Sequence, residues 1–299
     1  MEDGIVAKVL LPLALGIIML GLGLTLTLDD FKRVARVPKA VFVGLVCQML
    51  ILPAACLGIA HLYSLSPELA VGLMLLAASP GGATANLFSH LAHGDVALNI
   101  TLTAVNSLLS LVTLPFIVNF SLEHFMGEGK AIPLQFAKVI QVFAIVLIPV
   151  SIGMLLRAKR TTFARRMERP VRILSAALLA SIVLVAVIRQ FDELAASFAA
   201  VGLAALTFNL VSMGIGYGVP KIVRLPEPQA IAIGMEIGIH NGTLAIALAL
   251  SPQILNNPTM SIPAAIYSLI MFFTAAGFGW LVSRKARAEF AAASNTPVA

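Results

Sequence analysis

The sequence predicts an all-α protein that crosses a lipid bilayer many times, and three observations lead to this fold class. Of the 299 residues, 59% are hydrophobic and only 11% are charged, too few charges to cover the surface of a water-soluble domain of this size. The apolar residues form runs about as long as the ~20 residues of helix that cross a bilayer core. Lys and Arg gather after the first, fifth, seventh and ninth of these runs. One domain is enough for a chain of this length.

Nine apolar runs are expected to span the membrane as helices. The N-terminal residues "MEDGIVAKV" begin acidic and lack a small-residue cleavage site, so we expect no removable signal peptide. Cys47 and Cys56 lie in one run, about 13 Å apart along a helix axis, which is too far for a disulfide. The expected spans are residues 5–27, 40–63, 67–92, 96–120, 133–157, 171–190, 197–222, 227–250 and 260–283.

The distribution of basic residues over the loops predicts the topology. Basic residues cluster after spans one, five, seven and nine, whereas the other loops hold only Lys130 and Arg189. Because basic loops stay in the cytoplasm, we expect the N-terminus outside and the C-terminus inside a bacterial inner membrane. The net charge of +6 is therefore a topology signal and not a nucleic-acid surface. Binding of anionic lipid by the 157–172 loop stays open.

Two of the expected spans contain segments that cannot continue as regular helix. The third span contains "ASPGGATAN" (78–86), where Pro removes a hydrogen-bond donor and the glycines are weak helix formers. The eighth contains "GIHNGT" (238–243), with a milder Asn-Gly break. Non-helical backbone at membrane depth is tolerated where protein buries it or where it lines a cavity. Two such segments in related positions of two halves predict a transporter binding site between inverted repeats.

Three segments carry a resemblance to a known family: "GLGLTLTLDDFKRV", "PGGATANLFSHLAHGDVALNITLTAVNSL" and "EIGIHNGTLAIALAL". Here the chain resembles the bile acid:sodium symporter family, in order from the first span to the ninth. The resemblance implies a panel domain and a core domain, with two discontinuous helices crossing in the core and the first helix of the first repeat missing. The expected parts are a single transporter domain (1–299), repeats at about 1–125 and 130–285, core helices within 67–120 and 197–250, and a cytoplasmic tail (286–299).

The resemblance implies a first sodium site at five positions. They are Ala85 and Asn86 after the Pro-Gly-Gly, Asn99 and Thr103 in the next span, and Glu236 in the other broken span. Ala85 supplies no hydroxyl where the family has one, and Asn99 replaces a hydroxyl with a carboxamide. An oxygen is still offered at Asn99, so we expect this site to survive with changed geometry.

The resemblance also implies a second sodium site, which this chain alters. It would use Glu236, the backbone carbonyls of Ile237 and Ile239, Gln48 from an earlier span, and a Gln four residues after Glu236. That last position is His240 here. We therefore expect one sodium ion and leave the second open. A His-Asn pair of some members aligns with Met271 and Phe272, so the pocket should be less polar on that side.

The residue chemistry fits both a cation and an anion. Sodium is a hard cation that prefers carboxylate, carboxamide, hydroxyl and carbonyl oxygens, and Glu236 is the single formal charge between Gln229 and Ser283. Broken helices expose free N–H groups at the starts of their second halves, which attract anions. The expected anion-binding residues are Ala83, Thr84, Ala85, Asn241, Gly242 and Thr243.

His240 allows three interpretations. A neutral ring nitrogen is able to bind sodium, an imidazole titrates near neutral pH and is able to carry a proton in place of the second ion, and a buried histidine often serves only as a hydrogen-bonded structural residue. These interpretations stay open at the level of sequence.

The predicted function is sodium-coupled symport of an organic anion by alternating access. The expected substrate is a small carboxylate such as pantoate or a keto acid, with bile acids as a further candidate. Proton-coupled or mixed symport through His240 is the alternative. A membrane enzyme using Glu236 and His240 is disfavoured because no H-E-x-x-H or G-x-S-x-G motif is present, and a channel because no repeated filter motif is present. We expect a monomer in the bilayer with no nucleic-acid partner.

Overall fold

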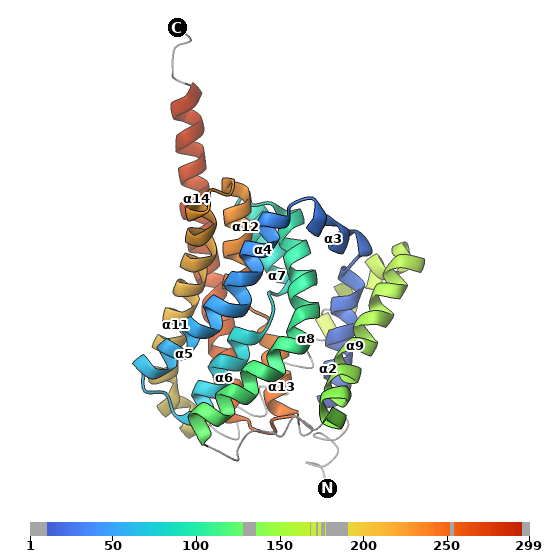
Figure 1. The fold of residues 1–299 in the computed structure, drawn as a ribbon, viewed down its shortest axis with the longest axis vertical. Coiled ribbons are helices and arrows are strands. Elements are labelled where there is room, and N and C mark those ends of the chain that lie inside the picture. Colours follow the sequence, from blue (N-terminus) through green and yellow to red (C-terminus); the bar gives the residue numbers. More distant parts are fainter. Residues whose placement is uncertain are drawn as a thin grey trace.

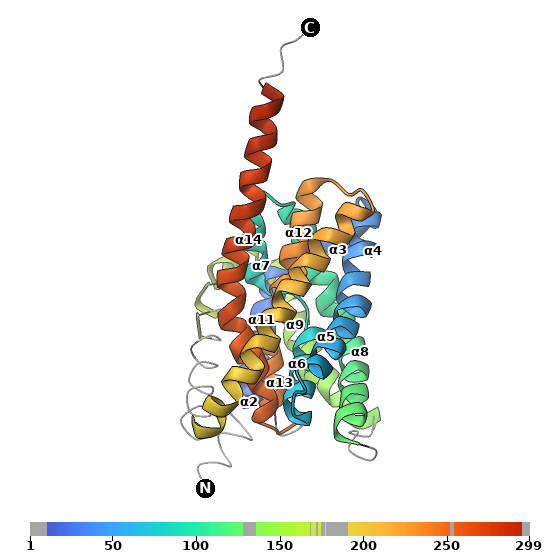
Figure 2. The ribbon, with the colours of Figure 1, turned by 90° about the vertical axis from the view of Figure 1, so that its left-hand side faces the viewer.

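The computed structural model describes residues 11–127, 136–167, 169–171, 173–174, 177, 191–251 and 254–294. Within these residues the chain is helical, as predicted, and the one β-type pairing is an isolated bridge between Gly81 and His240. The helices run roughly side by side, and the C-terminal part of the last helix projects beyond the others (Figures 1 and 2). Most of the expected span at 171–190 lies outside the described residues.

Four segments of the described chain are long and apolar enough to cross a membrane. Of the other expected spans, two are broken into shorter helices, and α2 (Leu11–Thr25) is described only from Leu11 onward. The four are Pro38–Leu62, formed by α4 (Pro38–Val46), the π-helical turn η3 (Cys47–Ile51) and α5 (Leu52–Leu62); α8 (Val96–Met126); Val201–Ile222 within α11 (Phe191–Ile222); and Thr259–Val282, formed by η4 (Thr259–Ser261) and the first part of α14 (Ile262–Ser294).

Both predicted interruptions are present. The third span consists of α6 (Pro67–Ala78) and α7 (Ala83–Leu91), and the eighth consists of α12 (Glu227–Gly238) and α13 (Gly242–Leu250). The residues of α6, α12 and α13 are buried almost throughout. A helix that is apolar on every side packs inside a bundle, so these broken helices form the centre of the protein.

The pair formed by α2 and α9 (Phe136–Lys159) lies beside the rest of the bundle (Figure 1). Glycines let the two helices approach closely: a Cβ atom at Gly153 would lie 2.5 Å from the Leu20 carbonyl oxygen, and one at Gly23 would overlap the Val150 backbone. Small residues commonly allow such close packing of membrane helices. The pair is thus held together by its own backbone contacts.

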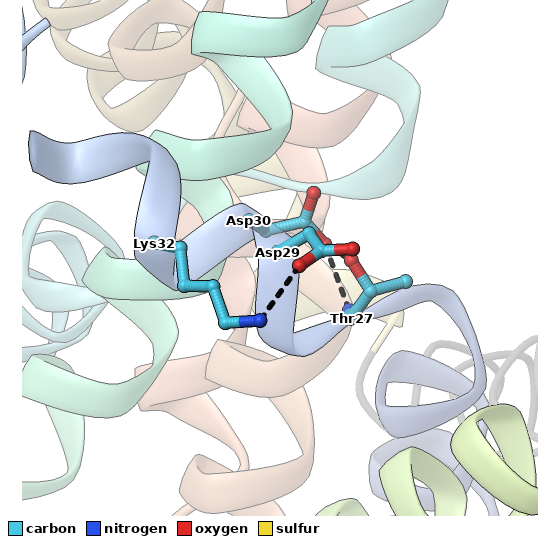
Figure 3. A network of polar contacts seen from close by, with 4 residues as sticks. All are labelled: Thr27, Asp29, Asp30 and Lys32. Carbon is cyan, nitrogen blue, oxygen red and sulfur yellow. Dashed lines mark hydrogen bonds and ion pairs between the residues drawn. The ribbon is translucent and has the colours of Figure 1, made fainter. Parts of the chain in front are cut away.

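A short helix, α3 (Leu28–Lys32), connects this pair to the bundle and packs on α8. At its start, the Thr27 amide and hydroxyl both donate to Asp30 Oδ2, each at 2.7 Å (Figure 3). Asp29 and Lys32 form an exposed ion pair at 3.1 Å. An N-terminal carboxylate of this kind satisfies amides that a helix leaves free, so the connection has a defined shape. After it, η2 (Arg33–Ala35) leads into α4.

Candidate functional site

The two helix breaks cross and satisfy each other's backbone groups. The Gly82 amide donates to the Ile239 carbonyl at 3.0 Å, and the Asn241 amide donates to the Pro80 carbonyl at 2.8 Å. Backbone groups that leave a helix at membrane depth need partners from protein or a wet cavity. The antiparallel bridge supplies partners for these backbone groups and holds the two breaks against each other.

Gly81 is required at the crossing because a larger residue does not fit. A Cβ atom built at this position would overlap the carboxyl group of Glu236. The carboxyl group therefore packs directly on the bridge backbone. Glycine is needed here because the carboxyl group approaches the backbone closely. A left-handed backbone is not the reason, since Gly81 has no positive φ.

The Glu236 carboxylate is fully buried in α12 and faces α8. Thr103 Oγ1 donates to its Oε2 at 2.6 Å, and Asn106 Nδ2 donates to its Oε1 at 3.3 Å. Asn99 lies one turn before Thr103 and donates its Nδ2 to the Ala232 carbonyl at 2.8 Å. Residues 99, 103 and 106 follow the spacing of one helix face, so α8 presents a polar edge to the carboxylate.

Several amide oxygens of this region are buried without a hydrogen-bond partner. They belong to Asn86 in the first turn of α7 and to Asn99 and Asn106 on α8. An unpaired buried acceptor is unfavourable, and in most proteins a bound water or ion satisfies it. Carboxylate, hydroxyl and amide oxygens are the ligands that a hard cation such as sodium takes, so the residues present fit a sodium ion.

His240 lies on the other side of the bridge. Its Nδ1 is 3.1 Å from the Ser79 carbonyl, so Nδ1 carries a proton, and in the neutral ring Nε2 then holds a lone pair. Nε2 is buried and has no partner. The ring stacks on Phe208 with centroids 5.5 Å apart and meets Tyr267 edge-on at 5.4 Å. The imidazole is thus fixed in one orientation between two aromatic rings.

Gln48 reaches the same carbonyl from the π-helical turn. Its Nε2 donates to Ala77 at 3.1 Å and to Ser79 at 3.0 Å, and its Oε1 is buried without a partner. A π-turn adds one residue to a helix and often occurs at functional sites. Gln48 and His240, which the family resemblance places in one site, therefore converge on the end of α6.

Side-chain hydrogen bonds also stabilise the end of α12, as those of Gln48 do at the end of α6. Asn209 Nδ2 and the Tyr267 hydroxyl both donate to the Gly238 carbonyl at 2.9 Å. Sequence reasoning missed Asn209, Tyr267 and Asn106. Asn106 could have been predicted from the sequence, because it follows Thr103 by three residues on the same helix face. Asn209 and Tyr267 could not, because they reach the end of α12 from helices that are distant in sequence.

A cavity separates the α2–α9 pair from the crossing. It reaches the two breaks at Pro80 and at Leu244, in the first turn of α13. Its wall on α8 includes Ser107, whose hydroxyl has no hydrogen-bond partner, and Ser110. None of the described lining residues is charged. The apolar part of the wall is formed by Met19, Leu22, Leu26, Phe31, Ala104, Leu108, Leu111, Val150 and Met154.

The residues expected to bind an anion begin the second half of each broken helix. Thr84, Asn241 and Thr243 are half-buried, and Ala85 is buried. Asn241 Oδ1 accepts the Leu244 amide at 3.0 Å, which caps α13. At Gly242 a Cβ atom would overlap the Ser268 hydroxyl. Met271 and Phe272, expected on the pocket wall, do not line the described cavity; Phe272 stacks on Phe88 instead.

Comparison with known proteins identifies the family. The sequence pattern of the Sodium Bile acid symporter family matches residues 12–197, more than half of the chain. The chain belongs to this family. It is 28% identical over 255 residues to "Uncharacterized sodium-dependent transporter YocS" of Bacillus subtilis, covering 85% of this chain and 77% of that protein.

Two further relatives come from eukaryotes. "Probable sodium/metabolite cotransporter BASS2, chloroplastic" of rice is 30% identical over 266 residues, covering 88% of this chain and 61% of that protein. "Sodium/bile acid cotransporter 4" of human is 30% identical over 254 residues, covering 83% of this chain and 57% of that protein. The chain thus spans about three fifths of the length of these two relatives.

Membership of the sodium bile acid symporter family determines the general class of activity. The family and its named members are sodium-dependent membrane transporters and not enzymes. Of the alternatives weighed on sequence, the membrane enzyme is therefore excluded. Among the described residues no three His, Cys, Asp or Glu side chains form a cluster for a transition metal.

Proposed function

We propose that this protein is a symporter that couples sodium entry to the uptake of a small organic anion across a bacterial inner membrane. The observation that carries the proposal is the fully buried carboxylate of Glu236, which faces α8, where the buried amide oxygens of Asn99 and Asn106 have no partner. A sodium ion on the carboxylate would neutralise its charge and satisfy such oxygens. Glu236, Asn86, Asn99 and Thr103 are the proposed ligands of this ion.

The proposed substrate binds between the α2–α9 pair and the crossing. The cavity there is mainly apolar and touches both helix breaks, so an anion would rest its carboxylate near the helix starts and its body against the wall. Of the amides at those starts, the ones of Ala85, Gly242 and Leu244 already donate within the protein. Pantoate and keto acids suit this arrangement, and bile acids are a further candidate. The proposed contacts are the residues expected from the sequence, which adjoin the breaks but are not among the described lining residues of the cavity: Ala83, Thr84, Ala85, Asn241, Gly242 and Thr243.

Coupling would follow from the geometry of the crossing. Sodium on Glu236 would order the bridge that positions both helix starts, and the ordered starts would bind the anion. Alternating access would then move the panel, which includes α2 and α9, against the core. We propose a monomer because one chain would contain both repeats.

An inverted repeat of four and five helices is the proposed architecture, with repeats at about 1–125 and 130–285 and core helices within 67–120 and 197–250. Gln48 supports it by donating to the end of α6 much as Asn209 donates to the end of α12. Each proposed repeat also contacts the other near a broken helix. The Asp95 amide, after α7, donates to the Pro228 carbonyl at the start of α12. The backbone of Met260, before α14, packs closely on Gly72 of α6.

The proposed topology places the N-terminus outside and the C-terminus in the cytoplasm. Lys39, after the first expected span, donates to the Val223 carbonyl at 2.7 Å, so two of the basic loops meet at one end of the bundle. The chain after residue 286, proposed as a cytoplasmic tail, continues α14 as far as Ser294. This helical extension supports a tail that projects from the bilayer (Figure 2).

Uptake into proteoliposomes tests the proposal. Labelled pantoate, a labelled keto acid and a labelled bile acid would be offered under an imposed sodium gradient, with a potassium gradient as control. We expect concentrative, saturable uptake of one of them in the sodium arm. Passive flux that does not saturate, or uptake equal in both arms, would contradict sodium symport.

A proton-coupled or mixed mechanism is the second candidate, and the buried lone pair of His240 favours it. Nε2 and Gln48 Oε1 are two acceptors without partners on the imidazole side of the bridge. A proton on Nε2 would place a positive charge where a second sodium would bind. Alternatively, Nε2, Gln48 Oε1 and the carbonyls of Ile237 and Ile239 would hold that sodium. Uptake driven by a pH gradient without sodium would support the proton mechanism.

A further inference from the structure

Asn106 contacts the Glu236 carboxylate, although the sequence pattern did not single it out. The side chain is fully buried on α8, and its Nδ2 lies 3.3 Å from Glu236 Oε1. Its Oδ1 is also buried and has no hydrogen-bond partner. A fully buried carboxamide with a free oxygen beside a carboxylate is the kind of group that binds a cation.

The carboxamide is able to serve the carboxylate in two ways. In the structure, its N–H group donates to Oε1. Rotation of the amide plane by 180° exchanges nitrogen for oxygen at nearly the same position. The same side chain therefore offers a donor to a bare carboxylate and an oxygen to a cation that lies on it, with little movement of α8.

The helix face around Asn106 extends the polar edge of α8. Asn99 and Thr103 precede it at helical spacing, and Thr103 donates to the other carboxylate oxygen at 2.6 Å. In α7, Ala85 has no side-chain oxygen to offer. A hard cation takes about six oxygens. The side chains proposed so far supply fewer, so the site is able to accept a further oxygen ligand from α8.

Asn106 also lies next to the substrate cavity. Its neighbours Ala104, Ser107 and Ser110 line that cavity, as does Pro80, the residue before Gly81 at the bridge. Movement of the Asn106 amide would therefore reach the cavity wall through one turn of α8. Asn106 thus contacts the carboxylate and is next in sequence to Ser107, a residue of the cavity wall.

We propose that Asn106 is a ligand of the transported cation and that it transmits cation binding to the cavity. The identification of the cation as sodium rests on the proposed function. Because the ligand acts through its oxygen, its loss should weaken sodium binding far more than it slows transport at saturating sodium.

The test compares four proteins: the unaltered chain, Asn106→Leu, Asn106→Asp and Thr101→Ala. Leu keeps the volume without an oxygen, and Asp keeps the oxygen. Thr101 is the matched control, since it is buried in α8 and its hydroxyl donates to Ala97 of its own helix at 2.9 Å. Sodium affinity is measured by calorimetry on purified protein, and sodium activation of labelled anion uptake is measured in proteoliposomes.

We expect Asn106→Leu to raise the sodium concentration for half-maximal binding and uptake at least tenfold, with maximal uptake retained within about threefold. Asn106→Asp should recover most of the affinity, and Thr101→Ala should stay within twofold of the unaltered protein. A sodium affinity of Asn106→Leu equal to that of Thr101→Ala would overturn the inference. If Asn106→Leu does not fold, Asn106→Ala replaces it. Absence of sodium dependence in the unaltered protein would instead contradict the proposed function.

Discussion

The two sides of the helix crossing differ in chemistry although they share one bridge. On one side the Glu236 carboxylate meets hydroxyl and amide groups of α8. On the other side, His240 lies between two aromatic rings and donates to a helix-end carbonyl. The carboxylate side holds a buried acidic group whose charge a bound cation would balance. The imidazole side holds a ring that hydrogen bonding and aromatic contacts keep in one orientation.

This difference assigns separate tasks to the two sides. Charge and free oxygens make the carboxylate side responsive to a cation. Hydrogen bonds from Gln48 and Asn209 to the ends of α6 and α12 make the imidazole side a support that keeps the breaks in place. We therefore expect substitutions on the carboxylate side to change sodium dependence, and substitutions on the imidazole side to change stability or ion number.

The largest effect is expected for Glu236→Gln. Removing the charge removes the main attraction for a buried cation, so sodium-driven uptake should fall at least about 100-fold. Asp29→Asn is the control, because this carboxylate is 86% exposed and its ion pair contributes little. Uptake is measured under a sodium gradient at equal protein content. Uptake by Glu236→Gln above a tenth of the unaltered rate would remove Glu236 from the sodium site.

Gly81→Ala should have the next largest effect. Its Cβ atom would overlap the Glu236 carboxyl group, and overpacking of this kind costs about 1–3 kcal/mol. We expect lower thermal stability and sodium affinity reduced about tenfold. Gly58→Ala is the matched control, since nothing lies within 4 Å of a Cβ atom there. Equal behaviour of the two variants would show that the crossing has room for a larger residue.

His240→Gln would sharpen the comparison by restoring an amide at the altered position. If the ring carries a proton in place of a second sodium, uptake by the unaltered protein rises as the pH falls, because the protonated ring supplies the second positive charge. The variant should lose this pH dependence, and its Hill coefficient for sodium should rise from about one to about two. An unchanged pH profile would exclude the proton-carrying role and leave two roles for His240, a neutral sodium ligand or a structural residue.

The smallest effect is expected for Tyr267→Phe. The variant removes one of two donors to the Gly238 carbonyl, and Asn209 still satisfies the acceptor, so the loss should be about 1 kcal/mol. Thermal unfolding in detergent measures it, with Tyr63→Phe as a half-buried control whose hydroxyl contacts Thr207. A large shift in sodium affinity in Tyr267→Phe would contradict the purely supporting role of this side.

Local sequence was sufficient to predict the helical class and the two breaks. Pro80 removes a backbone donor and Asn241-Gly242 favours a turn, and both effects act within a few residues. Asn99 and Thr103 were also predictable as neighbours, because helical spacing alone puts them on one face. That Asn99 and Thr103 share a site with Glu236, by contrast, was implied only by the family resemblance.

What the sequence by itself determined is the membrane class, the positions of the breaks and the residue types available for an ion. Only the tertiary structure decided that the breaks pair through Gly81 and His240, that Asn106 faces the carboxylate, and that His240 is held between Phe208 and Tyr267. The physical reason is that these contacts join residues that are far apart in the chain. Helix propensity and apolar periodicity act over a few turns, whereas such contacts depend on how whole helices pack.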